Sequence, residues 1–254
     1  MVNPHVSPTA IKTLRSDGIE ARNRLLDAAL ALFAEKGFAK TSTREIALAA
    51  QVNIASISYY FGDKAGLYRA VFTDPRCNPG IAPESIDDAT QSLSWSVTNL
   101  MRSFVEPLKQ DQLIQQCMKL HFREMLEPTG VWQQEVEGHI RPAHQALVAV
   151  LCRHLGLTKA DDDVQRLAFS IAGLGVMLHI CHDVIGTVSP QLMASHFALD
   201  QYCDRLVAYA IAMADAEAVR RAQLGTAQAK AKQTTQAVRS PSLAPVRPKS
   251  KTPK

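Results

Sequence analysis

The chain has 254 residues, of which 46% are hydrophobic and 20% are charged, and its formal net charge is +4. This length is sufficient for one large or two modest domains with a buried core. No uncharged apolar run of about 20 residues occurs, and residues 1–20 lack the apolar stretch of a signal peptide, so we expect a cytoplasmic protein without a membrane partner.

Charge is unevenly distributed along the chain. Residues 1–72 carry 9 Lys/Arg against 6 Asp/Glu, residues 73–219 carry 10 against 18, and residues 220–254 carry 9 against none. A basic head on an acidic body is typical of a protein that contacts DNA through one end.

Residues 1–20 are predicted to form a flexible arm, because Pro4 and Pro8 disfavour helix. Lys12 and Arg15 would place positive charge beside the next segment. One hypothesis is that the arm contacts phosphate or the minor groove. The alternative is a disordered extension without a role.

Residues 22–36 have the spacing of an amphipathic helix. Gly37 follows, where a left-handed conformation would end the helix at low cost. We expect this helix to support its neighbours rather than to bind a ligand. Its apolar stripe is Leu26, Ala29, Leu30 and Phe33.

The stretch TSTREIALAAQVNIASISYYF, residues 41–61, predicts two short helices joined by a tight turn. Ser42 and Glu45 have the spacing of a capping box at the start of the first helix. Asn53 is a suitable N-cap for the second helix, which we expect over residues 54–61.

The second of these helices has an outward face suited to the DNA major groove, because small residues allow close approach and hydroxyl groups reach bases and phosphates. Arg44, on the preceding helix, is suited to a bidentate contact with guanine. Lys64 would lie near a phosphate. The alternative is an ordinary helical hairpin with a polar face. The outward residues are Ile54, Ala55, Ser56, Ser58 and Tyr59.

Residues 21–72 resemble the N-terminal domain of the TetR family of transcriptional regulators. The matching segments are ARNRLLDAALALFAEKGF, TSTREIA, AAQVNIASISYYF and DKAGLYRAVF. The resemblance implies an all-α fold, in which a three-helix helix–turn–helix domain precedes a helical ligand-binding and dimerisation domain. The contacts to double-stranded DNA that it implies are Thr43, Arg44, Ile54, Ala55, Ser56, Ser58, Tyr59, Tyr60 and Lys64.

Two positions depart from the family pattern. Gln51 stands where the turn usually has glycine, and Ser58 stands where tyrosine is common. The base preference at Ser58 is therefore open, while the fold is unaffected.

Residues 64–72 are predicted to be the helix that links head and body. The proline-rich segment 74–83 would mark the domain boundary, followed by an effector-binding and dimerisation domain over residues 84–222. Residues 121–147 resemble the C-terminal domain of the CecR-like subgroup. The helices expected in this domain are 84–106, 111–126, 131–155, 161–186 and 190–222.

Residues 164–186 are apolar nearly all round, which requires cover on every side. A symmetric partner could supply part of that cover, and residues 192–213 provide a second stripe for a homodimer. The alternative is a central helix buried within one chain. The candidate interface residues are Ala168, Ala172, Gly175, Leu206, Ala210 and Met213.

An apolar cavity for an unidentified small-molecule effector is expected between the helices of the body. Plain core packing is the alternative for each residue. The candidate lining is Phe104, Met118, Phe122, Met125, Trp132, Phe169, Met177 and His179.

The five cysteines are scattered without a C-x-x-C pair, so reduced thiols are expected. His179 and His182 share a helical face, as do Glu135 and His139, but neither pair supplies the three or four ligands of a metal site. No metal or other cofactor is expected. The usual catalytic motifs are also missing, so no enzyme activity is expected.

Residues 223–254 contain no acidic or aromatic residue and are predicted to be a disordered basic tail. One hypothesis is that the tail adds salt-sensitive DNA affinity. The alternative is a solvated tail with no role.

The resemblance implies a ligand-responsive regulator, usually a repressor, that binds a palindromic operator as a dimer. An architectural protein that coats DNA without an effector is the alternative function. The large acidic body disfavours it.

Overall fold

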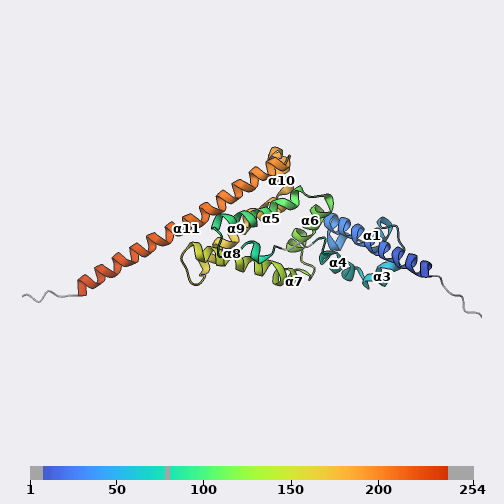
Figure 1. The fold of residues 1–254 in the computed structure, drawn as a ribbon, viewed down its shortest axis with the longest axis horizontal. Coiled ribbons are helices and arrows are strands. Elements are labelled where there is room, and N and C mark those ends of the chain that lie inside the picture. Colours follow the sequence, from blue (N-terminus) through green and yellow to red (C-terminus); the bar gives the residue numbers. More distant parts are fainter. Residues whose placement is uncertain (1–7, 78–80, 240–254) are drawn as a thin grey trace, which may run out of the picture.

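The computed structural model describes residues 8–77 and 81–239, and every regular element in these two ranges is a helix (Figure 1). The predicted all-α class is therefore confirmed. In chain order, the α-helices are α1 (Pro8–Lys40), α2 (Thr43–Ala49), α3 (Ala55–Phe61), α4 (Lys64–Phe72), α5 (Leu93–Lys109), α6 (Gln112–Leu126), α7 (Trp132–Glu135), α8 (Arg141–His154), α9 (Asp162–Ile180), α10 (His182–Val188) and α11 (His196–Arg239). Shorter turns of helix are η1 (Pro83–Ser85), η2 (Val136–Ile140) and η3 (Pro190–Leu192).

The head consists of α1 to α4, which gather at one end of the molecule (Figure 1). Its core contains the expected stripe of α1, and Phe33, Ile46 and Leu67 are all fully buried. Regular α1 geometry is interrupted at Gly37, where φ is 79°. Thr41 secures this bend, because its hydroxyl donates to the Gly37 carbonyl at 2.8 Å.

Helix α1 begins at Pro8, so the prediction of a flexible arm is wrong from that residue onward. Proline is tolerated in the first turn of a helix, because its missing N–H would have no intrahelical partner there. The extended helix passes close to α3, and a Cβ built on Gly18 would lie 3.3 Å from the Tyr60 hydroxyl. The first seven residues of the predicted arm lie outside the described residues.

The body is built from α5, α8, α9 and α11, which enclose a second core. Helix α5 starts later than predicted, because the Ser92 hydroxyl caps it at Trp95 N. Pro107 lies inside its last turn rather than ending it. The helix expected over residues 161–186 breaks at Cys181 into α9 and α10, which are bent by 70°.

Helix α11 has 44 residues and runs along the body to the end opposite the head (Figure 1). It continues through residues 223–239, so the predicted disorder of this part of the tail is wrong. Alanine, glutamine and lysine dominate the segment and favour helix, which outweighs the single Gly225. Residues 240–254 of the predicted tail lie outside the described residues.

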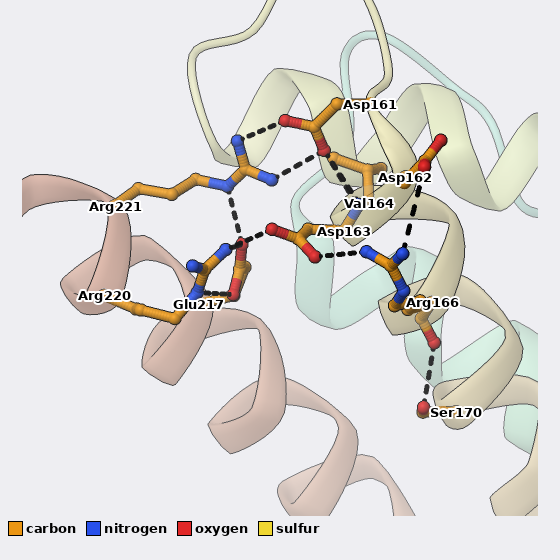
Figure 2. Close-up of polar contacts among 9 residues, drawn as sticks. All are labelled: Asp161, Asp162, Asp163, Val164, Arg166, Ser170, Glu217, Arg220 and Arg221. Carbon is orange, nitrogen blue, oxygen red and sulfur yellow. Dashed lines mark hydrogen bonds and ion pairs between the residues drawn. The ribbon is translucent and has the colours of Figure 1, made fainter. Parts of the chain in front are cut away.

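Ion pairs fasten α11 to the start of α9 (Figure 2). Arg221 donates to both carboxylate oxygens of Asp161 at 2.8 Å, and Arg220 donates to Asp163 at 2.7 Å. Glu217 accepts from both arginines. The Arg221 guanidinium and the Val164 N–H lower the pKa of Asp161. These contacts fix the direction in which α11 leaves the body.

Helix α6 joins the head to the body by packing on α1 and α4. Lys119 pairs with Glu35 at 2.9 Å, and the ring of His121 stacks on Phe72 at 4.3 Å. The Tyr68 hydroxyl donates to the Glu124 carboxylate at 2.7 Å. Helix α6 is therefore shared between head and body.

Cys77 and Cys117 form a disulfide, so the prediction of five reduced thiols is wrong for this pair. The two residues are 40 positions apart in the chain, but their Cα atoms lie 5.0 Å apart. Sequence spacing gave no sign of the pair, because the packing of α6 against the end of α4 brings the two residues together.

In the described ranges, no single helix is long and apolar enough to cross a membrane. Helices α9 and α10 pass that test only when taken together as a bent pair.

Candidate nucleic-acid interface

The start of α2 has the predicted capping box. Ser42 Oγ accepts from Glu45 N at 3.1 Å, and Glu45 Oε2 accepts from Ser42 N at 2.9 Å. Lys36 approaches Glu45 at 2.9 Å. The Lys36 ammonium and the Ser42 hydrogen bonds lower the pKa of Glu45 to about 2. The cap fixes the first turn of α2, on which two predicted contacts, Thr43 and Arg44, are located.

The turn between α2 and α3 contains a left-handed residue that is not glycine. Gln51 has a φ of 54°, and it is the one non-glycine residue with positive φ among residues 8–77 and 81–239. Arg24 Nε donates to the Ala50 carbonyl at 3.2 Å, which holds the turn against α1. The predicted N-cap at Asn53 is wrong by one residue, because α3 starts at Ala55 and its N-cap is Ile54, without a side-chain cap; Asn53 Oδ1 instead accepts from Ala55 N at 2.9 Å within the turn.

Helix α3 presents the expected small and aromatic face. Ile57 is buried beneath it, whereas the Tyr59 side chain is 83% exposed. Tyr59 and Tyr60 meet edge to face at 4.8 Å. Of the other predicted contacts, Arg44, Ile54, Ala55 and Ser58 are exposed, and Thr43, Ser56, Tyr60 and Lys64 are half-buried.

Lys64 has a second role that the sequence did not indicate. Its ammonium lies 4.4 Å from the centre of the Phe38 ring, at the bend that ends α1. Asp63 Oδ1 caps α4 by accepting from Gly66 N at 2.7 Å. Lys64 is therefore a predicted phosphate contact that also takes part in the packing that positions α4.

The residues predicted to line an effector cavity do not surround one space. His179 Nε2 donates to the Phe104 carbonyl at 2.8 Å, and its ring stacks on Phe122 at 4.5 Å. Burial of His179 lowers the pKa of its imidazole. Phe169 and Met177 point to solvent, with exposed fractions of 63% and 55%. The remaining three, Met118, Met125 and Trp132, are half-buried, and Trp132 packs against the core of the head.

A cleft lies instead between head and body. It comprises two hollows of about 380 and 170 Å³, which share Phe38, Tyr68 and Thr129. Arg123 and Glu127 line the larger hollow. The cleft therefore touches the end of α1, the middle of α4 and the loop after α6.

Beneath this cleft lies the fully buried carboxylate of Glu124, which the sequence suggested, together with Arg123, as an anchor for a polar ligand or as half of a structural ion pair. Glu124 accepts from the Tyr68 hydroxyl and from Thr129 N, each at 2.7 Å. Burial, together with the hydrogen bond to Glu124, raises the pKa of Tyr68. Glu124 thus has a structural role, but its partners are Tyr68 and Thr129 rather than the neighbouring Arg123.

Four of the six residues predicted for the dimer interface are covered by other parts of their own chain. Ala168, Leu206 and Ala210 are buried in the core of the body, and a Cβ on Gly175 would clash with Phe104. Those four are unavailable to a partner, because their own chain already covers them; Ala172 and Met213 are half-buried. Apolar side chains that are exposed on the same helices are Phe169, Met177, Ile180, Val184, Val188, Phe197 and Tyr209.

Across residues 8–77 and 81–239, no three His, Cys, Asp or Glu side chains are grouped closely enough to hold a metal ion.

Two family descriptions match the chain. Residues 25–71 match bacterial regulatory proteins of the tetR family. Residues 95–214 match the C-terminal domain of the HTH-type transcriptional dual regulator CecR. Both resemblances that were predicted from the sequence are confirmed.

Similar proteins cover both parts of the molecule. The HTH-type transcriptional dual regulator CecR of Shigella flexneri is 33% identical over 155 residues, which cover 57% of this chain and 69% of the relative. The HTH-type transcriptional regulator YvkB of Bacillus subtilis strain 168 is 31% identical over 183 residues, covering 68% and 90%. NalD, the secondary repressor of the MexAB-OprM multidrug efflux pump in Pseudomonas aeruginosa, has a similar fold, with a TM-score of 0.56, 18% identity and coverage of 77% and 97%.

Replacing Gln51 by glycine should stabilise the protein. A left-handed residue that has a Cβ costs about 1–2 kcal/mol, and the greater freedom of glycine in the unfolded chain offsets part of this gain. We expect Gln51→Gly to raise the free energy of unfolding by about 0.5–1 kcal/mol in urea titrations. Gln51→Ala, the control, retains the Cβ and should give no gain; equal stabilisation by both variants would contradict the strain argument.

Proposed function

Because the chain belongs to the TetR family of bacterial regulatory proteins, we propose that it is a transcriptional repressor that binds a near-palindromic operator as a dimer. The observation that carries this proposal is the exposed face of α3, whose small residues and Tyr59 stand clear of the core. A regulator of this kind acts in the cytoplasm, where the DNA is.

The contacts divide into those that would recognise bases and those that would hold phosphates. Arg44 is exposed at the start of α2 and is suited to a guanine edge. Lys64 lies at the start of α4, where a phosphate contact would position the head without reading sequence. Ser58 is too short to reach far into the groove, so Tyr59 supplies most of the aromatic contact area of α3.

Binding to random duplexes at physiological salt, followed by sequencing of the bound fraction, tests this proposal. We expect an enriched palindrome. Arg44→Ala should lose about 1–3 kcal/mol of discrimination at one base pair of each half-site, whereas Lys64→Ala should weaken all duplexes alike. Lys159→Ala, which removes an exposed lysine of the body, is the matched control. Binding without enrichment would favour the architectural alternative.

We infer that the dimer forms through the exposed apolar face of α9, α10 and the first turns of α11. Val184 and Val188 lie one turn apart on α10 with exposed fractions of 60% and 76%, and Phe197 is 70% exposed. Large apolar side chains exposed on consecutive helices are a surface that a partner would cover, and a twofold partner would cover the same face on both copies.

Charge placed on this face should separate the dimer. In sedimentation velocity at micromolar concentration, we expect the wild type to be dimeric and Val188→Glu to shift it to monomer, because two buried carboxylates would face each other without partners. Leu126→Glu, at an apolar residue that is 64% exposed on α6, is the matched control. A monomeric wild type, or dissociation by the control alone, would contradict the assignment.

We propose that the effector is a small organic anion with an apolar ring and that it binds the cleft between head and body. Phe38 and Tyr68 supply aromatic walls. The Arg123 guanidinium lies 3.5 Å from Glu127 Oε2 and donates to the Glu35 carbonyl at 3.2 Å. Because a guanidinium has five N–H donors, Arg123 keeps donors for a carboxylate. A ligand in the cleft touches α4 and would bias the position of the head.

Benzoate can serve as a probe of this site in ligand-observed NMR, with uncharged benzamide as the control. We expect saturation transfer to benzoate but little to benzamide, and loss of the benzoate signal in Arg123→Ala. Arg166→Ala, in the distant network of α9, should leave it unchanged. Equal signals from benzoate and benzamide, or undiminished benzoate binding by Arg123→Ala, would refute the assignment.

A further inference from the structure

The disulfide between Cys77 and Cys117 lies at the junction on which the proposed regulation depends. Cys77 follows the end of α4, and Cys117 is on the face of α6 that packs against the head. The two side chains are 3% and 1% exposed and belong to the core of the head. The bond therefore joins the last part of the head covalently to α6, the helix that head and body share.

The segment that carries Cys77 is also held by charge. The Arg76 guanidinium contacts Asp74 at 2.8 Å and Asp27 of α1 at 2.9 Å. Helix α4 itself is attached to α6 by the Phe72–His121 stack and by the Tyr68–Glu124 hydrogen bond. These contacts are non-covalent, whereas the bond at Cys77 can be broken by chemistry without removing a side chain.

A protein that binds bacterial DNA works among thiol reductants, which keep most cysteines reduced. A disulfide at a domain junction in such a protein is more consistent with a transient, responsive bond than with a permanent brace. We propose that Cys77 and Cys117 are a reversible redox-modification site and that their oxidation fixes the position of the DNA-binding head on the body. Reversibility in the cell and the effect on DNA rest on the proposed function, whereas formation and reduction of the bond can be measured without DNA.

The chemistry is thiol–disulfide exchange with small thiols and disulfides. In reduction, a thiolate of an external dithiol attacks one sulfur of the bond, forming a mixed disulfide and releasing the other cysteine as a thiolate. The second thiol of the reductant then displaces the first cysteine. The protein gains two electrons and two protons, and the reductant leaves as a disulfide. In the reverse direction, one glutathione disulfide oxidises the pair and leaves as two glutathione molecules.

Access requires a local opening rather than unfolding of the whole head. Thr73, Pro75 and Arg76 are exposed, so Cys77 lies directly beneath a surface segment. The ion pair that ties this segment to α1, Arg76 with Asp27, is exposed on both sides, and pairs of this kind contribute little to stability, so opening the segment should cost less than unfolding the head. Exchange should therefore take minutes to hours.

The experiment uses the full chain with the three free cysteines replaced, as Cys152→Ala, Cys181→Ala and Cys203→Ala. After glutathione disulfide, intact mass following alkylation should show no alkylated thiols, and after dithiothreitol it should show two. Hydrogen exchange of the amides in α4 and the following segment should be slower in the oxidised protein. Affinity for the library-selected duplex should differ between the two states by about fivefold or more, the usual range of coupling between sites.

Cys77→Ala with Cys117→Ala in the same background is the matched control, since alanine suits both buried positions and cannot form the bond. It should show neither the exchange difference nor the affinity difference. Two alkylated thiols after oxidation, or a bond that forms without changing exchange or affinity, would overturn the proposal. If neither state binds DNA, the proposed function fails, while mass and hydrogen exchange still decide whether the redox site exists.

Discussion

The buried carboxylate of Glu124 is the interaction on which the arrangement of head and body depends. A carboxylate without contact with water is costly unless its oxygens are hydrogen-bonded. Here one oxygen accepts from Tyr68 of the head and the other from Thr129 of the loop after α6. The loop, α6 and α4 must therefore keep one geometry together, and any displacement of the head leaves this group short of donors.

The same helix carries most of the other contacts described at this junction, and Trp132 of α7 adds packing against the core of the head. Lys119 and Arg123 hold the end of α1, His121 stacks on α4, and Cys117 holds the segment beyond α4. Because these side chains lie on one rigid element, an anion at Arg123 and an oxidant at Cys117 would act on the same two-state arrangement. This is the physical basis for proposing two inputs to one DNA-binding head.

The head was predictable from sequence because its signals are local. The capping box at Ser42 and the turn hydrogen bond of Asn53 connect residues only two or three positions apart, and the helical period of the apolar residues predicted which of them point inward. The junction was not predictable, because the Cys77–Cys117 and Tyr68–Glu124 contacts cross 40 and 56 positions. Because α9 is apolar nearly all round, the sequence allowed it to be covered either by a second subunit or by its own chain. In the structure, α11 of the same chain covers part of α9.

The ion pairs of Asp161 with Arg221 fix the direction of the last part of α11 relative to the body. From Arg221 to Arg239, the helix extends roughly 27 Å at 1.5 Å per residue, away from the end that holds α3 (Figure 1). The helix–turn–helix of the head and the C-terminal part of α11 therefore lie at opposite ends of the molecule (Figure 1). A fluorophore attached to the C-terminal part of α11 would therefore report on the protein without touching α3. A surface linker at the same place would immobilise the protein and leave α3 free to bind DNA.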